Sequence, residues 1–359
     1  MKKRTVIFML IAFCIMFSSC GINYKLPEDI GSTLTESGTS VGDKLPIEEN
    51  DIFGDGEGQS LGFIQHSAVK PQTDDNGGKL LYLYDGEEMS IDYSFQVDGK
   101  GESIGFLMFV NGEAQAYRVD SSQDLEYCHL FETDGKAERE FTFHFFPVNG
   151  KKGENINLEV VSIFNPSFVP DMADTTSYGW YHRIVSNCYI IQMEQDAPSR
   201  QDIQQDNVIK NIKCKTKKVT KEYLETNLAA MGWSSLTTES LNGQTYYEIL
   251  YNGKITYDNI KLEKGDNLHI SYSLCGSPGV EYVSTLFIGH VPVKIGDLLM
   301  MQTKLSKGDV STWEIELDTG SLPELSTFYI ISVPRNAADY PDVNAMVIKT
   351  DSICLFKED

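Results

Sequence analysis

Basic residues are scarce in this chain. Lysine and arginine together number 30 against 52 aspartates and glutamates, which gives a formal net charge of −22 over 359 residues. A surface that binds nucleic acid needs a basic face, because much of its affinity comes from displacing the counterions of the phosphates. We therefore expect no nucleic-acid partner.

Sequence motifs for catalysis, metals and cofactors are also missing. The chain contains no H-E-x-x-H, no phosphate-binding loop and no dinucleotide fingerprint. Its histidines are scattered, without a pair at metal-ligand spacing: His66, His129, His144, His182, His269 and His290. Residues 38–42 fit the G-x-S-x-G pattern, but a hydrolase elbow needs a buried strand before it and a helix after it, and neither pattern occurs there. The sequence thus predicts no catalytic residue, no metal site and no cofactor, and it favours a non-enzymatic protein.

One enzymatic alternative stays open. A glycosidase needs two carboxylates at a suitable separation, and that separation is a property of the fold rather than of the sequence. A hydrolase acting on carbohydrate or peptidoglycan is therefore an alternative function, with acidic residues that the sequence cannot name.

Cysteine usage gives no sign of a disulfide framework. No C-x-x-C occurs, and the cysteines beyond the N-terminal region are odd in number and widely spaced: Cys128, Cys188, Cys214, Cys275 and Cys354. Small disulfide scaffolds have even counts at close spacing. We expect free thiols, most of them buried as small hydrophobic side chains.

Long hydrophobic runs are missing as well, with one short exception at the N-terminus. Lys2, Lys3 and Arg4 precede an unbroken apolar run over residues 6–17. A membrane-spanning helix needs about 20 such residues, so a run of this length predicts the hydrophobic region of an export signal.

The residues after that run, Phe17-Ser18-Ser19-Cys20, resemble the lipobox of bacterial lipoproteins. The resemblance implies that the Cys20 sulfur receives a diacylglyceryl group and that Cys20 becomes the mature N-terminus. It implies a protein held at the cell membrane by lipid, outside the cytoplasm. Phe17 departs from the family, which usually has Leu or another aliphatic residue there, and an ordinary secretory signal cleaved near Ser19 is the alternative.

Residues 20–58 are predicted to form a flexible acidic tether after a signal peptide at 1–19. From residue 21 to 58 the chain has nine acidic residues and two lysines, with many Gly, Ser and Thr and no sustained periodicity. A flexible coil of this length reaches on the order of 35 Å, and like charges extend it further.

Beyond the tether, the pattern predicts β-strands. Alternating apolar residues place Met89, Ile91, Tyr93 and Phe95 on one face of a strand. Asn-Gly and Asp-Gly pairs separate such runs, and these pairs favour tight hairpins. Helical periodicity is scarce, with one candidate over residues 222–231. The fold class is therefore all-β, with two tandem immunoglobulin-like (Ig-like) antiparallel β-sandwich domains.

The chain also repeats itself. Residues 84–95 resemble residues 263–274, and later strands match in the same order. This predicts a tandem duplication, with domain 1 at 59–196, a linker at 197–239 and domain 2 at 240–359. Each copy is expected to have its own core, with few apolar contacts between the copies.

Six lysines gather within the predicted linker, between Lys210 and Lys221. They could attract an anionic polymer or lipid headgroups. Alternation of Ile212, Cys214 and Thr216 with lysines favours the other interpretation, an edge strand whose lysines prevent pairing between sheets.

An aromatic cluster lies before the last strand of the first copy. Tyr178, Trp180 and Tyr181 could form a flat platform for a sugar ring, or they could cover the end of a core.

Taken together, the sequence predicts a lipid-anchored surface protein that binds or scaffolds another protein or a cell-wall polymer. Besides the hydrolase, a second alternative is a binding lipoprotein associated with a transporter. The scarcity of alternating strand and helix patterns counts against that alternative.

Replacing Cys20 with serine tests the anchor. If the lipobox functions, Cys20→Ser should move the protein from the membrane fraction to the medium, or leave it with an uncleaved signal, because serine offers no thiol for lipid attachment. Cell fractionation measures where the protein is, and mass spectrometry of the product shows whether the signal has been removed. Unchanged detergent partitioning with a cleaved signal would contradict the anchor.

Overall fold

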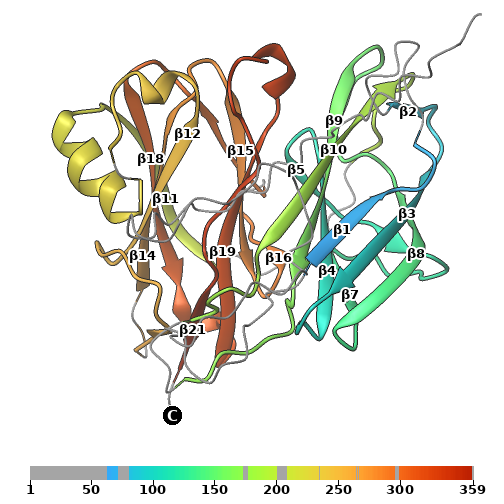
Figure 1. Cartoon of the computed structure of the whole chain (residues 1–359), viewed down its shortest axis with the longest axis horizontal. Helices are drawn as coiled ribbons and strands as arrows, with labels where there is room; N and C mark the ends of the chain where they lie inside the picture. Colours follow the sequence, from blue (N-terminus) through green and yellow to red (C-terminus); the bar gives the residue numbers. More distant parts are fainter. Residues whose placement is uncertain are drawn as a thin grey trace, which may run out of the picture.

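The fold consists of two β-sandwiches placed side by side (Figure 1). The computed structural model describes residues 63–71, 81–172, 177–199, 208–233, 235–263, 265, 267–295 and 299–357. The predicted signal, Cys20 and the tether lie outside the described residues.

Each sandwich has one four-stranded sheet and one larger sheet. In the first sandwich the four-stranded sheet has the order β1 (Phe63–Ala68), β3 (Met89–Asp98), β8 (Lys136–Phe145) and β6 (Arg118–Val119). The larger sheet has the order β2 (Leu81–Tyr84), β10 (Ile184–Met193), β9 (Asn155–Phe164), β4 (Ser103–Val110) and β5 (Glu113–Gln115), with β7 (Cys128–Glu132) also on β4.

The second sandwich repeats this plan. Its four-stranded sheet has the order β11 (Ile209–Lys218), β18 (Asp309–Asp318), β14 (Asn267–Gly276) and β12 (Thr245–Tyr251). The larger sheet has the order β13 (Ile260–Lys261), β21 (Ile353–Phe356), β19 (Leu325–Pro334), β15 (Glu281–Ile288) and β16 (Val291–Pro292). Strand β17 (Met301–Lys304) pairs with β15, and β20 (Ile348–Lys349) pairs with β19.

Helix is confined to short segments in the described part of the chain. These are η1 (Tyr223–Leu228), η2 (Ser240–Asn242), η3 (Thr319–Ser321) and η4 (Ala337–Asp339). Helix η1 falls within the predicted helical segment and buries Leu224 and Leu228. None of the helices in the described residues is long and apolar enough to cross a membrane.

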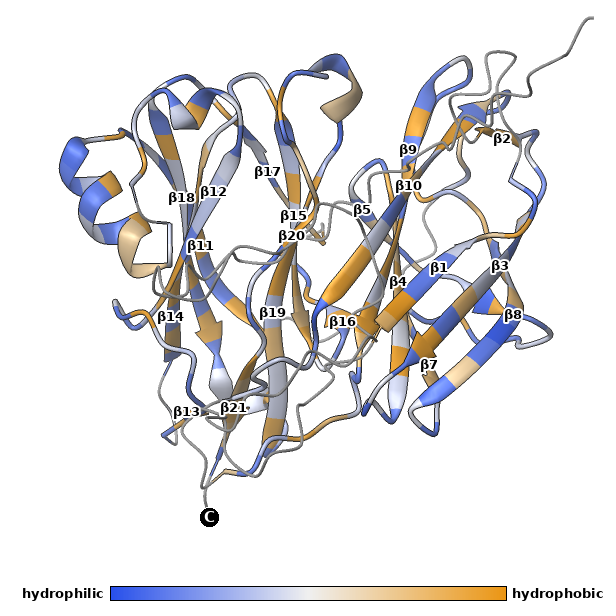
Figure 2. Ribbon diagram, in the orientation of Figure 1, coloured by the Kyte–Doolittle hydropathy of each residue, from blue (hydrophilic) through white to orange (hydrophobic). Residues whose placement is uncertain are grey.

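Strand order confirms the predicted all-β, Ig-like fold class. In immunoglobulin lettering the first sandwich has an A-B-E-D sheet facing a larger sheet built on G-F-C, to which β2 adds at the G edge and β5 and β7 add at the C edge. The predicted alternation holds in β3, where Met89, Ile91, Tyr93 and Phe95 are buried and the residues between them are mostly exposed. Hydropathy alternates visibly along these strands in Figure 2.

The two sandwiches pair corresponding residues. Tyr93 faces Phe141 between β3 and β8, and Tyr272 faces Trp313 between β14 and β18. The larger sheets agree too: Met108 pairs with Val160 in one copy, and Leu286 pairs with Ile330 in the other. The sequence repeat therefore corresponds to a repeat in strand order and register.

The lysine-rich segment forms β11, an edge strand on β18. This agrees with the edge-strand interpretation of its lysines. Strand β11 lies within the predicted linker, yet it pairs with β18 from Leu317 to Asp309 and so belongs to the second sandwich. It occupies the edge that the two-residue β6 occupies in the first sandwich.

The expectation of few apolar contacts between the copies is wrong. A third hydrophobic cluster joins Leu107, Phe109, Val161 and Ile163 of the first copy to the second. Its members from the second copy are Phe287, Leu299, Tyr329, Ile331, Val333 and Val347. Because β4, β9, β15 and β19 are apolar on both faces, the outer faces of the two larger sheets pack against each other.

A tight turn of the first copy packs against the second copy. Asn111 and Gly112 both have positive φ, as predicted for an Asn-Gly hairpin. A Cβ added at Gly112 would lie 2.7 Å from the Cβ of Val283 in the second copy. Glycine is required here both for its backbone conformation and for the contact.

The five described cysteines form no disulfide, as expected, but their burial differs from the expectation that most are buried. Cys275 and Cys354 are buried, Cys128 is half-buried, and Cys188 and Cys214 are exposed. The two exposed thiols lie on β10 and β11, on side-chain positions that the second sheet of each sandwich does not cover.

Truncating the interface should destabilise the whole molecule. Phe109 is fully buried, and its ring lies edge-on to Phe287 with centroids 6.1 Å apart. Phe109→Ala should lower the free energy of unfolding by about 3–5 kcal/mol, as measured by urea denaturation. The matched control Leu83→Ala, at an apolar residue 49% exposed on β2, should change it by less than about 0.5 kcal/mol. Equal effects would show that the copies do not depend on this contact.

Candidate functional site

The first sandwich carries a cleft of about 210 Å³ at one end. Its walls come from β5 and β6, from the segments around residues 123–127 and 145–148, and from residues 198–199 after the last strand. Ala114, Ala116 and Tyr127 belong both to this lining and to the cluster between the copies. The cleft therefore borders the joint between the two sandwiches.

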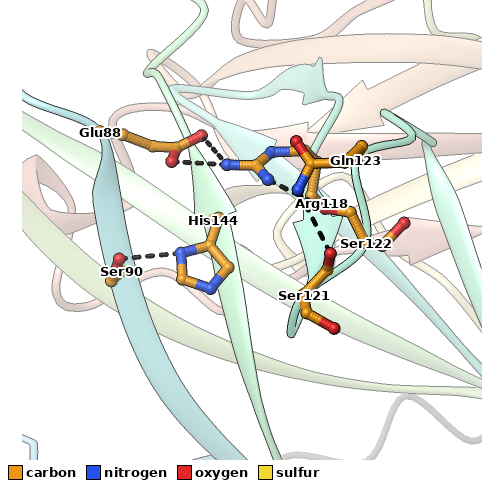
Figure 3. Close-up of polar contacts among 7 residues, drawn as sticks. All are labelled: Glu88, Ser90, Arg118, Ser121, Ser122, Gln123 and His144. Atoms are coloured by element: carbon orange, nitrogen blue, oxygen red, sulfur yellow. Dashed lines mark hydrogen bonds and ion pairs between the residues drawn. The ribbon is translucent and has the colours of Figure 1, made fainter.

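Arg118 and Glu88, both in the cleft lining, form an ion pair; Figure 3 shows the pair. Arg118 Nη2 donates to both carboxylate oxygens of Glu88, at 2.7 and 2.6 Å, and Arg118 Nη1 donates to the backbone oxygen of Ser122 at 2.9 Å. The side chains of Arg118 and Glu88 are 20% and 30% exposed, respectively. A guanidinium held by three hydrogen bonds presents fixed donors in the cleft lining, and the Glu88 carboxylate supplies the acceptors.

Neighbouring strands extend this polar surface. Register places His144 of β8 between Ser90 of β3 and Arg118 of β6. Ser90 Oγ and His144 Nδ1 are 2.9 Å apart, as Figure 3 shows. One sheet therefore aligns these three side chains on the face opposite the core.

The Ser90–His144 pair has the separation of a nucleophile and its base. A serine hydrolase also needs a third group that orients the histidine and donors for the oxyanion. Among the described residues, no carboxylate hydrogen bond to His144 is present, and Ser90 stands on an open sheet. A glycosidase would need two carboxylates, and the described lining contains Glu88 as its single carboxylate.

Another part of the cleft lining is largely apolar and is held by Gln115. Gln115 Nε2 donates to the backbone oxygen of Phe146 at 3.0 Å, and Gln115 Oε1 accepts from the Val148 amide at 2.7 Å. These bonds anchor the segment that carries Phe146, whose side chain is 36% exposed in the lining. An exposed aromatic ring in the same lining as fixed polar groups can hold a ligand with one apolar face and several hydroxyl or amide groups.

The predicted aromatic cluster lies elsewhere, and the structure separates its members. Tyr178 is buried, and its hydroxyl lies 2.6 Å from Thr327 Oγ1 of the second copy. Tyr181 is half-buried beside Phe168, with ring centroids 4.2 Å apart. Trp180 is 48% exposed and lies under the Arg183 guanidinium. The three rings therefore do not share one open face.

Sequence reasoning missed the cleft residues because its search was for motifs. Glu88 and Arg118 are 30 residues apart in the chain and carry no recognisable spacing. Arginine is rare here, with six in the whole chain, and Arg118 stands between apolar neighbours in a short strand. The rarity of arginine and the position of Arg118 between apolar residues were the available signals, but neither identifies Glu88 as its partner.

A buried carboxylate lies on the interface side of the first sandwich, outside the cleft lining. Glu159 of β9 is 6% exposed, between Phe109 on β4 and Cys188 on β10. Burial raises the pKa of Glu159 to about 7, and a hydrogen bond with Cys188 opposes this shift. Since the carboxyl lies in packed surroundings, its shift reflects the interface rather than a catalytic pocket.

Comparisons with known proteins identify no family. No family model matches the sequence, and no curated protein matches it. Among solved structures, the chain matches the N-terminal Ig1-2 module of the Drosophila receptor protein tyrosine phosphatase DLAR, at 10% identity over 82% of this chain and 99% of that one, with a TM-score of 0.19. It also matches the Salmonella enterica SafA pilin in complex with the SafB chaperone (10% identity, 81% and 95% covered, TM-score 0.21) and the E. coli chaperone DraB (11%, 82% and 97%, 0.21). Scores this low carry no argument, so the fold is assigned from strand order alone.

Neutralising Glu159 should change how stability depends on pH. Its pKa in the folded protein exceeds the ordinary value of 4.5, so the folded state loses stability as the pH rises from about 4.5 to about 7. Glu159→Gln should therefore raise the free energy of unfolding at pH 8 by up to about 3 kcal/mol and change it little at pH 4. Denaturation at both pH values measures this. The exposed control Glu138→Gln should change neither, and a Glu159→Gln gain that is equal at both would contradict the assignment.

Proposed function

We propose that this protein is a lipid-anchored binding module outside the cytoplasm, and that the cleft at Arg118 and Glu88 holds one unit of a cell-surface polymer. The observation that carries the proposal is the cleft itself, whose lining contains both a fixed ion pair and the exposed Phe146 ring.

The size of the cleft supports a small recognised unit. Pockets for drug-sized ligands occupy about 300–1,000 Å³, and this cleft is smaller, at about 210 Å³. It would hold a single sugar ring or a short side chain while the remainder of a polymer lies outside. The polar strip of Ser90, His144 and Arg118 beside it offers further hydrogen-bonding groups.

The N-terminal sequence supports the location. A signal-like run ending at Cys20 would place two or more acyl chains in the membrane, and two chains hold a protein stably where one would not. With a net charge of −22, the body would be repelled by anionic lipid, and the acidic tether would hold it away from the headgroups.

Sedimentation of the full chain with isolated cell-wall polymer tests this function. Wild-type protein should sediment with the polymer, and Phe146→Ala should weaken binding about tenfold, which corresponds to about 1.4 kcal/mol for a lost ring contact. Glu88→Gln should weaken it as well, because Arg118 would lose its charged partner.

Leu83→Ala is the matched control, because Leu83 is apolar and exposed but is not part of the cleft lining. It should bind like wild type. Equal binding by Phe146→Ala and wild type would overturn the assignment of the cleft. Capture by a cell-surface protein in place of the polymer would overturn the polymer as the partner.

A further inference from the structure

A group of titratable side chains fills the joint between the two sandwiches, away from the cleft. We call it the joint cluster, and its members are Tyr178, His182, His290, Tyr329, Lys349 and Ser352. The first two come from the connection between β9 and β10 of the first copy, and the others come from the second copy. The His182 and His290 rings have centroids 5.3 Å apart, so one histidine from each copy meets at the joint.

His182 connects the first copy to the second. Its side chain is 1% exposed, and its ring lies against Tyr178 with centroids 4.2 Å apart. His182 Nδ1 is 3.1 Å from Ser352 Oγ. The neighbouring Ser177 Oγ accepts from the Cys354 amide at 2.6 Å, so the same segment is held at two points.

His290 makes the reciprocal connection. Its Nε2 is 3.0 Å from the backbone oxygen of Pro166 in the first copy, and its Nδ1 is 3.0 Å from the Tyr329 hydroxyl. A neutral imidazole satisfies both partners, because Nε2–H donates to the carbonyl and Nδ1 accepts from the hydroxyl. A second proton on Nδ1 would remove that acceptor from Tyr329, which is fully buried.

A lysine adds positive charge to the same place. Lys349 Nζ donates to Ser352 Oγ at 2.9 Å and to the Thr350 backbone oxygen at 3.0 Å, and it lies 4.6 Å from the centre of the Tyr329 ring. Burial lowers the pKa of Lys349 to about 7, with the charge of Asp351 opposing, so its ammonium forms fully only on the acidic side of pH 7. Burial raises the pKa of Asp351, with Lys349 and Arg183 opposing. Both histidines experience the positive charge of Lys349.

We propose that the joint cluster is a proton-operated switch: neutral His182 and His290 hold the two sandwiches together, and protonation of both opens the joint. Protonation would place two imidazolium ions and one ammonium ion side by side at a joint where His182 is buried and His290 and Lys349 are half-buried. Like charges at this separation repel strongly in a buried setting.

The lowered pKa values of His182 and His290 agree with opening of the joint at acidic pH. Burial lowers the pKa of His290 to about 4, with a backbone hydrogen bond to Pro166 opposing and Lys349 adding to the shift. Burial, with Lys349 and His290, likewise lowers the pKa of His182 well below 6.5. An exposed histidine has a pKa near 6.5, so the closed joint loses stability as the pH falls from about 6.5 to about 4.

For His290 alone the shift corresponds to roughly a 300-fold change in the ratio of closed to open molecules. Glu159 acts in the opposite direction on the same interface, because it gains a proton below about pH 7 and then sits more favourably in the closed state. Asp351 beside Lys349 also has a raised pKa and acts in the same direction as Glu159. His182, His290 and Lys349 therefore have to outweigh two carboxyls.

Hydrogen exchange of the full chain in detergent micelles tests the switch. Exchange is followed peptide by peptide from about pH 7.5 to about pH 4.5, after correction for the intrinsic rate. Residues 164–172, 177–183 and 287–292 should lose protection at acidic pH while the core strands β3 and β14 keep theirs. His290→Gln should keep the joint protected over the whole range, since its amide can still donate to Pro166.

Two further variants separate the switch from general acid unfolding. Lys349→Met should shift the opening to lower pH, because the repelling charge is gone. His66→Gln is the matched control: His66 is also buried, with a pKa lowered to about 4, but it lies inside the first sandwich and bonds Tyr93. It should leave the joint unchanged. Joint peptides that stay protected at acidic pH, that open together with β3 and β14, or that respond equally to His66→Gln and His290→Gln would each overturn the proposal.

Discussion

The packing of one outer sheet face on another organises this molecule. Strands β4, β9, β15 and β19 are apolar on both sides, so each larger sheet needs a second covering layer besides its own sandwich partner. The two copies supply that layer to each other through Phe109, Phe287 and Tyr329. The connection around Tyr178 then folds over the second copy, and the cleft forms where the remaining edge of the first copy meets the following segment.

The two copies share a plan but treat their four-stranded sheets differently. In the second copy, helix η1 covers the side opposite the core, with Leu224 and Leu228 packed against Tyr246 and Cys275. In the first copy the corresponding side stays open and carries Ser90, His144 and Arg118. The first copy, which has the open face, also has the cleft. With the cleft as the proposed binding site, the first sandwich serves recognition and the second serves structure. This division rests on the proposed function of the cleft.

Positive charge is sparse in this acidic chain, and the partly buried cations lie at the cleft and at the joint. Lysines of β11 pair with acidic neighbours on β18, as Lys218 does with Asp309. Arg118 is held by Glu88 beside the cleft, and Lys349 lies at the joint. A buried charge costs more than an exposed one, so the few cations away from solvent mark the places where burial and ionisation compete.

Local sequence pattern determined the strands, the Asn-Gly turn at 111–112, the repeat and the edge character of β11, because alternation and turn chemistry act between residues close in the chain. It also pointed to free cysteines. The sequence did not reveal the joint, because a strand buried on both sides does not say which surface covers its second face. The Glu88–Arg118 pair, the meeting of His182 with His290 and the burial of Glu159 were decided by tertiary structure alone. The two contacts join residues distant in sequence, and only the folded chain brings them together. The burial of Glu159 likewise depends on the strands and the second copy that pack around it.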